Sequence, residues 1–172
     1  MAQWITEESF YNVRYTEMQD EKHLFAWLSI EEVVRWFPVA TIEESALFAK
    51  NWIGFSRYCC SLTGTVHGVP RGIATLFLMP YRKIAHLCMG YLVIDPMFQN
   101  RGIGTSLLRN LMHLGKTYFH LESVHFEVYE GSAFISILKK NRCQEIFRQE
   151  KYVKTKQGYM SRMVFEINFL NG

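Results

Sequence analysis

One stretch of the sequence, residues 84–108, constrains the fold more than any other. It begins with the apolar run IAHLCMGYLVI (84–94) and continues through a turn to the glycine-rich segment QNRGIG (99–104). Such a continuous apolar run is typical of a central strand that is covered on both faces. The residues that follow the glycines carry apolar side chains at helical spacing: Leu107, Leu108, Leu111 and Met112. The stretch therefore predicts a strand, a glycine loop and a helix in direct succession.

A glycine loop at the start of a helix is a potential anion site. The first N–H groups of a helix have no partner within it, and the helix dipole places partial positive charge there. Gly102 and Gly104 allow the backbone to curl and a ligand to approach without meeting a Cβ atom. A strand–helix turn that binds nothing is the alternative, because a bare Gly-x-Gly is a weak signal.

The sequence context argues against two other phosphate-binding loops. No G-x-x-x-x-G-K-S/T pattern is present in the chain, which excludes a P-loop nucleotidase. A dinucleotide fingerprint requires a third glycine, but Leu107 occupies that position.

The rest of the chain predicts a mixed α/β layer. Before the central strand we expect a first strand at 9–15, helices at 16–28, 30–37 and 41–55, and a hairpin of strands at 57–62 and 71–79. After the loop and its helix we expect a fifth strand at 123–130, a short helix at 132–141, and strands at 145–153 and 158–169. No linker or repeat interrupts this order, so the sequence predicts a single domain over 1–172.

Composition is that of a folded domain, with 49% apolar and 20% charged residues. No apolar run reaches the roughly 18 residues of a membrane span, and the N-terminal residues lack the layout of a secretory signal. We therefore expect a cytoplasmic protein without a membrane partner. The four cysteines lack metal-ligand spacing, so we expect reduced thiols and no metal site: Cys59, Cys60, Cys88 and Cys143.

Charge is distributed unevenly, although the net charge is only +3. Residues 1–50 carry an acidic excess, whereas residues 139–162 carry a basic excess. Solvated helix faces and an exposed hairpin account for this pattern better than a nucleic-acid footprint does. We therefore expect no nucleic-acid partner.

The segment YLVIDPMFQNRGIGTSLL (91–108) resembles the acyl-CoA-binding segment of the GNAT superfamily of N-acetyltransferases. That family has a strand, a turn with proline, and then Gln/Arg-x-x-Gly-x-Gly/Ala before a helix. Gln99, Gly102 and Gly104 occupy the three defining positions, and the order of elements over nearly the whole chain is also similar. The resemblance implies an α/β (α+β) fold with a mixed, mostly antiparallel central sheet, helices on both faces, and a V-shaped split between the fourth and fifth strands.

The same resemblance implies acetyl-CoA as co-substrate. In the family, the end of the fourth strand, here Leu92, Val93 and Ile94, binds the pantetheine arm, and a backbone N–H near Val93 polarises the thioester carbonyl. Loop amides hold the diphosphate, which assigns the following residues to cofactor binding: Gln99, Asn100, Arg101, Gly102, Ile103, Gly104 and Thr105.

Acyl transfer to an amine needs a base for the amine proton and an acid for the leaving thiolate. Glu127 is the first candidate base, because family members often have a glutamate on the fifth strand; there it shares a face with His125 and Tyr129. His86, on the predicted fourth strand, is the second candidate, since histidine titrates near neutral pH. For both, a polar residue at a wet sheet surface is the alternative.

The acid is less well defined by the sequence. GSAFISILKKNRC (131–143) is similar to N-x-A-S-I-x-V-L-x-K-x-G-F in the ribosomal-protein N-terminal acetyltransferase branch. This places Gly131 at the usual Asn and Leu138 near the usual Tyr, while Arg142 and Cys143 replace Gly-Phe. Tyr129 could protonate the sulfur instead, or the thiolate leaves unassisted.

The N-terminal helices read the acceptor in this family, and their acidic excess favours a cationic amine. Four aromatic residues are candidates for a groove, with the core as the alternative for at least half of them: Trp27, Trp36, Phe37 and Trp52. The resemblance thus implies acetyl transfer from acetyl-CoA to a primary amine, either a peptide or protein N-terminus or a small cationic amine. An acyl-CoA-binding regulatory or interaction module without catalysis is the alternative. The sequence leaves open the preferred acyl chain and whether the chain forms a homodimer.

Overall fold

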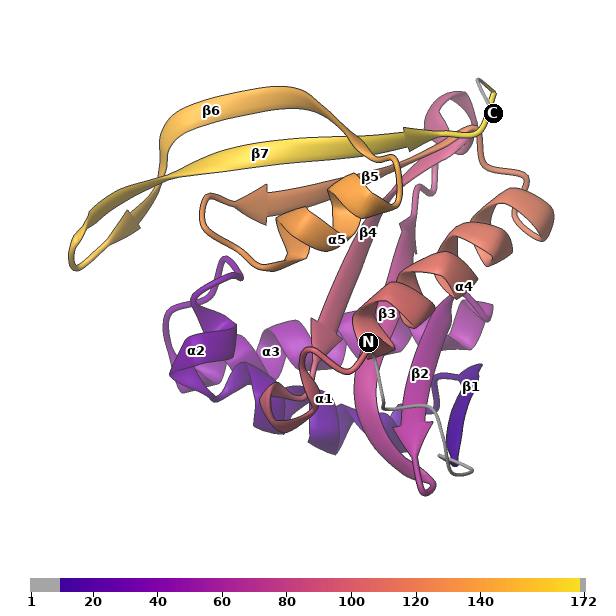
Figure 1. Cartoon of the computed structure of the whole chain (residues 1–172), viewed down its shortest axis with the longest axis horizontal. Helices are drawn as coiled ribbons and strands as arrows, with labels where there is room; N and C mark the ends of the chain where they lie inside the picture. The colour runs from indigo at the N-terminus through magenta and orange to yellow at the C-terminus, as the bar shows by residue number, and fades with distance from the viewer. Residues whose placement is uncertain (1–9, 171–172) are drawn as a thin grey trace.

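Seven strands form one sheet in the computed structural model, which describes residues 10–170 (Figure 1). Their order across the sheet is β1-β2-β3-β4-β5-β7-β6. The strands are β1 (Tyr11–Tyr15), β2 (Ser61–Val66), β3 (Val69–Leu78), β4 (Leu87–Ile94), β5 (Ser123–Tyr129), β6 (Gln144–Thr155) and β7 (Gly158–Asn168). Neighbouring strands are antiparallel except β4 and β5, which are parallel. The predicted mixed, mostly antiparallel sheet is confirmed.

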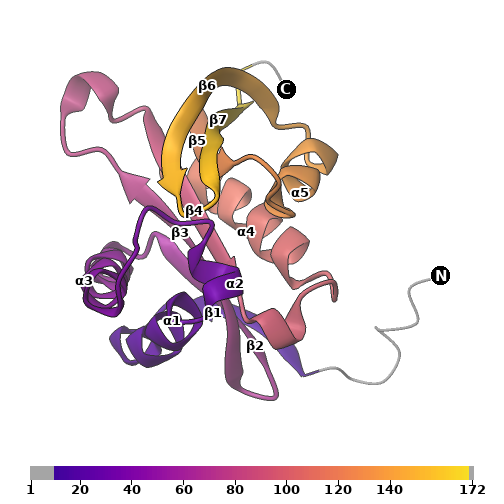
Figure 2. The same cartoon turned by 90° about the vertical axis from the view of Figure 1, so that its left-hand side faces the viewer.

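Helices lie on both faces of the sheet (Figure 2). One face carries α1 (Glu21–Leu28), α2 (Glu31–Val34) and α3 (Ile42–Ile53), and the other carries α4 (Ile103–Thr117) and α5 (Phe134–Lys140). Short 3-10 turns connect several elements: η1 (Met18–Asp20), η2 (Gly54–Tyr58), η3 (Arg82–Ile84) and η4 (Pro96–Phe98). Within residues 10–170, no helix is both long and apolar enough to cross a membrane.

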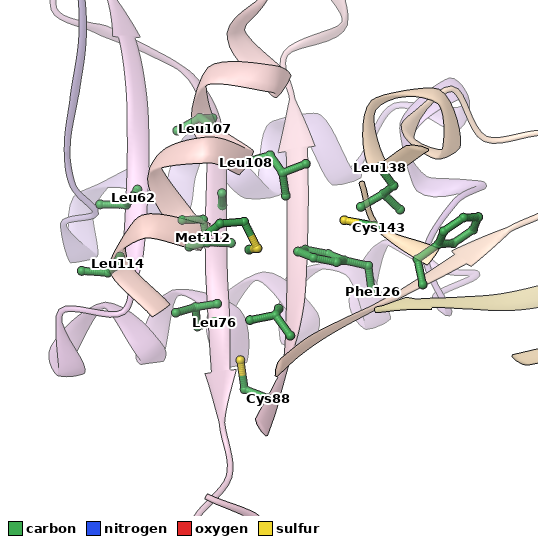
Figure 3. Close-up of a cluster of buried hydrophobic side chains, with 14 of the residues drawn as sticks. Leu62, Leu76, Cys88, Leu107, Leu108, Met112, Leu114, Phe126, Leu138 and Cys143 are labelled. Atoms are coloured by element: carbon green, nitrogen blue, oxygen red, sulfur yellow. The ribbon is translucent and has the colours of Figure 1, made fainter. Parts of the chain in front are cut away.

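Two apolar clusters hold the helices on the sheet. The stripe predicted from the sequence of α4 is buried against the sheet, in a cluster that includes Leu107, Leu108, Leu76 and Phe126 (Figure 3). On the opposite face, α1 and α3 bury a second cluster around Trp52. The indole N–H of Trp52 donates to the hydroxyl of Thr75 at 2.7 Å, so its polar atom is satisfied inside the cluster.

Most element types agree with the sequence prediction, but the strand predicted at 57–62 does not: Gly54–Tyr58 forms a 3-10 turn, and β2 begins only at Ser61. The other differences lie at boundaries. The fourth strand begins at Leu87 instead of 84, because Arg82–Ile84 forms a 3-10 turn. The second predicted helix (30–37) ends at Val34. Strand β6 is longer than the predicted strand at 145–153, whereas β7 ends at Asn168, one residue before the predicted end. Position 9, where the first strand was predicted to start, lies outside the described residues.

The β4–β5 contact is short and ends in a split. Three residue pairs align the two strands, the last of which joins Met89 to His125. At the next position, the ring of Phe126 lies over Gly90, where an ideal Cβ would be 2.3 Å from the ring atom Cε1. The strands then part, which produces the V-shaped split that the resemblance implies.

Candidate active site

The split between β4 and β5 opens into a cavity of about 460 Å³. Its walls come from the C-terminal half of β4, the glycine loop, β5, α5, and the segment around α2. The cavity therefore joins the predicted anion loop to the predicted catalytic strand.

One edge of β4 is unpaired along this cavity. The neighbouring strand β3 pairs with β4 as far as Ile94, whereas β5 pairs with it only as far as Met89. Among the described residues, the edge from Gly90 to Ile94 therefore has no partner strand. An extended ligand can bind such an edge through main-chain hydrogen bonds, as an added strand does.

The ladder with β3 determines which backbone groups of β4 face the cavity. The N–H of Asp95 donates to the carbonyl of Arg71 at 2.8 Å, so Asp95 directs its backbone to β3. Because backbone groups alternate sides along a strand, Val93 also faces β3, while Leu92 and Ile94 face the cavity. The backbone N–H donors that face the cavity are therefore those of Leu92 and Ile94, not that of Val93. Val93 itself still lines the cavity.

The glycine loop curls at Asn100 and Gly102, which have left-handed φ values of 60° and 82°. Gly102 is the N-cap of α4. In the part of the chain that the structure describes, no backbone N–H from Asn100 to Thr105 donates to another backbone group. These N–H groups, together with the start of the 15-residue helix α4, form a cradle of free donors of the kind that suits an anion.

Gly104 contributes differently from the sequence expectation. It lies inside the first turn of α4 and does not supply left-handed curvature. An ideal Cβ at Gly104 would be 3.1 Å from Cδ1 of Ile137 on α5. The small size of Gly104 therefore allows α5 to approach the start of α4.

Charged residues fix the turn that leads into the loop. Asp95 accepts hydrogen bonds from the N–H of Met97 at 2.9 Å and from Arg71 at 2.8 Å. The guanidinium groups of Arg71 and Arg101 lie 3.9 and 4.6 Å from the ring centroid of Phe98. The charge of Arg71 is balanced by Asp95, so Arg101 is the one of the two that adds positive charge beside the cradle.

Glu127 projects from β5 at the cavity wall, between two tyrosines that also line the cavity. Burial raises the pKa of Tyr91 to about 12, and the nearby Glu127 carboxylate adds to this shift. Burial and Glu127 likewise raise the pKa of Tyr129, which is only 2% exposed. Both phenols therefore keep their protons at neutral pH, beside a carboxylate that can accept one.

Comparison with known families agrees with this geometry. The sequence profile of the acetyltransferase (GNAT) family matches residues 3–133. The chain belongs to the GNAT family of acetyltransferases. A comparison with curated protein sequences gives no match.

Solved structures share the GNAT fold with this chain at low sequence identity. The GNAT-family acetyltransferase from Streptococcus pneumoniae has a TM-score of 0.74 at 17% identity, over 92% of this chain and 99% of that chain. yncA from Salmonella typhimurium, solved with its cofactor acetyl-CoA, has a TM-score of 0.73 at 11% identity, over 92% and 94%. The ribosomal-protein-S5-alanine acetyltransferase from Vibrio fischeri has a TM-score of 0.73 at 10% identity, over 94% of both chains. The predicted GNAT fold is confirmed.

The structure does not bring His86 to the GNAT cavity. His86 is exposed in the turn before β4, where its carbonyl accepts a hydrogen bond from the N–H of Glu122 at 2.7 Å. At about 3.3 Å per strand residue, it lies roughly 16 Å from Tyr91 along the chain. The prediction of a strand over 84–94 placed His86 too close to the chemistry.

The α5 helix presents no tyrosine to the cavity. Leu138, aligned with the usual GNAT tyrosine, is fully buried in the core. Gly131, aligned with the usual asparagine, has a φ of 92° and packs against Trp36, whose Cη2 lies 3.6 Å from an ideal Cβ of Gly131. Trp36 is at van der Waals distance from a Cβ at this position, and the left-handed φ is what favours glycine there.

The acceptor side of the cavity is lined by only part of the predicted residues. Trp36 and Phe37 line it, whereas Trp27 and Trp52 are 5% and 0% exposed and belong to the core. Of the acidic residues in the N-terminal helices, Glu32 lines the cavity. Others are engaged in the fold: Asp20 pairs with Arg14 at 2.8 Å, and Glu44 caps α3.

Two residues of the site were missed by the sequence analysis. Tyr91 lay within an apolar run that was interpreted as covered on both faces. Arg162, whose Nη1 lies 3.1 Å from Oε2 of Glu127, was counted only as part of the basic excess. A strict alternation test on each strand would have placed Tyr91 on the same face as Val93, but no local signal pairs Arg162 with Glu127.

Proposed function

We propose that this protein transfers an acetyl group from acetyl-CoA to a primary amine, which is either a peptide or protein N-terminus or a small cationic amine. The observation that carries the proposal is the continuity of the site. The free β4 edge, the loop N–H groups and the Glu127 carboxylate all border one cavity. A long cofactor with an extended amide-bearing arm and a diphosphate fits the first two.

The two binding elements suit two parts of acetyl-CoA. The backbone groups of Leu92 and Ile94 bind the pantetheine arm, and the N–H groups from Asn100 to Thr105 bind the diphosphate. Arg101 adds positive charge at the exposed side of the loop. This arrangement directs the thioester toward Glu127.

Glu127 serves as the general base, directly or through a water molecule. The neutral amine nitrogen attacks the thioester carbon, and a backbone N–H of β4 stabilises the oxyanion. As the carbon–sulfur bond breaks, the thiolate takes a proton from Tyr129, which burial keeps protonated, and Tyr129 regains a proton that the attacking nitrogen releases, through Glu127 or water. Tyr91 is the matched comparison for Tyr129 as proton donor, because it lines the same cavity and is also protonated at neutral pH.

The acceptor approaches along the wall formed by Glu32, Trp36 and Phe37. Glu32 and Glu127 place negative charge on the approach, and Phe37 adds an aromatic ring, whereas one face of Trp36 already holds the Arg35 guanidinium at 4.8 Å. This combination favours an amine that arrives as an ammonium ion and loses its proton at the base.

An assay of free thiol release from acetyl-CoA, run over a panel of peptide N-termini and small amines, tests the proposal. Glu127→Gln should lower kcat by about 10²-fold or more, the usual effect of losing a general base. Acetyl-CoA affinity should stay close to that of the wild type, because backbone groups elsewhere hold the cofactor. Wild-type turnover in Glu127→Gln would remove Glu127 from the mechanism.

A regulatory acyl-CoA-binding module is the second candidate. It is favoured by Gly131, Leu138 and Cys143, which depart from the usual GNAT pattern. Tight binding of acetyl-CoA, with no thiol release for any amine in the panel, would support it over the enzyme.

A further inference from the structure

Arg162 on β7 holds one oxygen of the Glu127 carboxylate. Its Nη1 donates to Oε2 of Glu127 at 3.1 Å, and the two side chains are 24% and 17% exposed. Among residues 10–170, no group donates a hydrogen bond to the other oxygen, Oε1. The pairing therefore fixes the carboxylate and leaves one oxygen for a ligand.

Arg162 is itself held by three residues of β6. Its Nη2 donates to Oε1 of Gln149 at 2.9 Å. The guanidinium carbon lies 4.1 Å from the ring centroid of Tyr152 and 5.4 Å from that of Phe147. A planar guanidinium gripped on its edge and its face has little rotational freedom.

A bulge in β6 makes this grip possible. Gln149 aligns with Arg162 and Val153 with Met160, so four steps along β6 match two along β7. In a regular strand, Tyr152 would point to the face opposite Gln149. The bulge, with Lys151 at a φ of 53°, instead brings both side chains to Arg162. Bulges of this kind redirect side chains next to active sites.

Stability does not account for the arrangement. Nε of Arg162 is buried and has no hydrogen-bond partner among the described residues. A partly buried ion pair is often no more stabilising than an apolar pair of the same size, and an unpaired buried donor adds a cost. The contact is therefore better explained by a role in the site.

We propose that Arg162 is a positioning residue that orients Glu127, with Oε1 turned toward the acceptor amine, and that the β6 bulge holds Arg162 in place. This inference rests on the proposed role of Glu127 as base. Arg162 acts through Glu127, so its removal should impair the chemical step and leave cofactor binding intact.

A double-mutant cycle in the thiol-release assay tests the proposal. Arg162→Gln should lower kcat about 10-fold or more, because a misplaced base loses much of its effect. KM for acetyl-CoA should stay within about two-fold. Arg162→Lys should recover part of the loss, since it keeps the charge and loses the fork. In the Glu127→Gln background, Arg162→Gln should cause no further loss.

Arg148→Gln is the matched control. Arg148 is an exposed arginine of the same hairpin that pairs with Glu145 at 2.9 Å, so its loss should leave kcat unchanged. Wild-type kcat in Arg162→Gln, or losses that multiply in the double variant, would overturn the proposal. An effect of Arg162→Gln equal to that of Arg148→Gln would do the same.

A crystal structure of Arg162→Gln gives a readout that does not depend on turnover. Glu127 is expected to occupy more than one rotamer in that variant. A single, unchanged Glu127 rotamer would refute the positioning role even if no acceptor amine is found. Wild-type activity in Glu127→Gln, by contrast, would show that the base assignment failed, and the positioning role with it.

Discussion

The ring of Phe126 on β5 occupies the space that a side chain at Gly90 on β4 would fill, with Cε1 only 2.3 Å from an ideal Cβ. Phe126 is fully buried and packs edge-on against Phe134, with ring centroids 5.7 Å apart. The contact falls one residue beyond the last β4–β5 pair. A glycine and a large ring thus meet where the two strands part.

Gly90→Ala should therefore destabilise the fold. The added methyl group would push a buried ring that cannot move freely, at an expected cost of about 1–3 kcal/mol in the free energy of unfolding. Urea denaturation measures the change. Gly54→Ala is the control, because an ideal Cβ at Gly54 meets nothing within 4 Å. Equal midpoints for Gly90→Ala and the wild type would show that the ring is free to shift.

Gly102→Ala separates strain from ligand binding. Gly102 and Gly68 both have left-handed φ values, 82° and 76°, and open space at Cβ. Alanine at either position should cost about 1–2 kcal/mol of stability, the strain of a left-handed non-glycine residue. Only Gly102→Ala should also weaken acetyl-CoA binding in titration calorimetry, since it distorts the N–H cradle. Equal affinity in both variants would reduce the loop to a turn.

Hydrogen exchange can identify the backbone groups that hold the cofactor. Acetyl-CoA should slow exchange at Leu92, Ile94 and the loop N–H groups, which lack backbone acceptors in the free protein. Exchange at Val93 should change little, because its N–H already faces β3. Amide-resolved NMR with and without acetyl-CoA makes the comparison. Protection gained at Val93 alone would contradict the conclusion that the N–H of Val93 faces β3.

Tyr91 makes the stability of the fold depend on pH in the alkaline range. Burial raises its pKa from 10.0 to about 12, so the folded state retains a proton that the unfolded chain releases. Its contribution to stability should be complete below pH 10 and lost as the pH rises from about 10 to 12. Denaturation midpoints over that range should fall less steeply in Tyr91→Phe than in the wild type. Identical slopes would show that other groups dominate.

Local patterns predicted the parts of the site that local physics determines. The α4 stripe and the loop at Gly102 follow from spacing and residue type, and the structure has both of them. The boundary of β4 was misplaced because Ile84 and Ala85 continue the apolar run, although Ile84 ends a 3-10 turn and residues 85–86 form a turn. That error carried His86 into the candidate site.

Long-range pairing decided the rest. Whether the backbone N–H of Val93 or those of its neighbours face the cavity depends on the register of β4 with β3, which no single segment encodes. The contact of Arg162 with Glu127 joins residues 35 positions apart and requires both the β5–β7 ladder and the β6 bulge. Such contacts follow only from the assembled sheet.

The short β4–β5 contact also determines how this domain can be engineered. Mutations that extend the pairing beyond Met89 and His125 would add ladder hydrogen bonds, each worth about 0.5–1.5 kcal/mol. The same mutations would close the edge that we propose binds the cofactor. A screen for heat resistance alone would therefore enrich variants that are stable but inactive. Stabilising substitutions should be sought on the far side of the molecule, around β1 and β2.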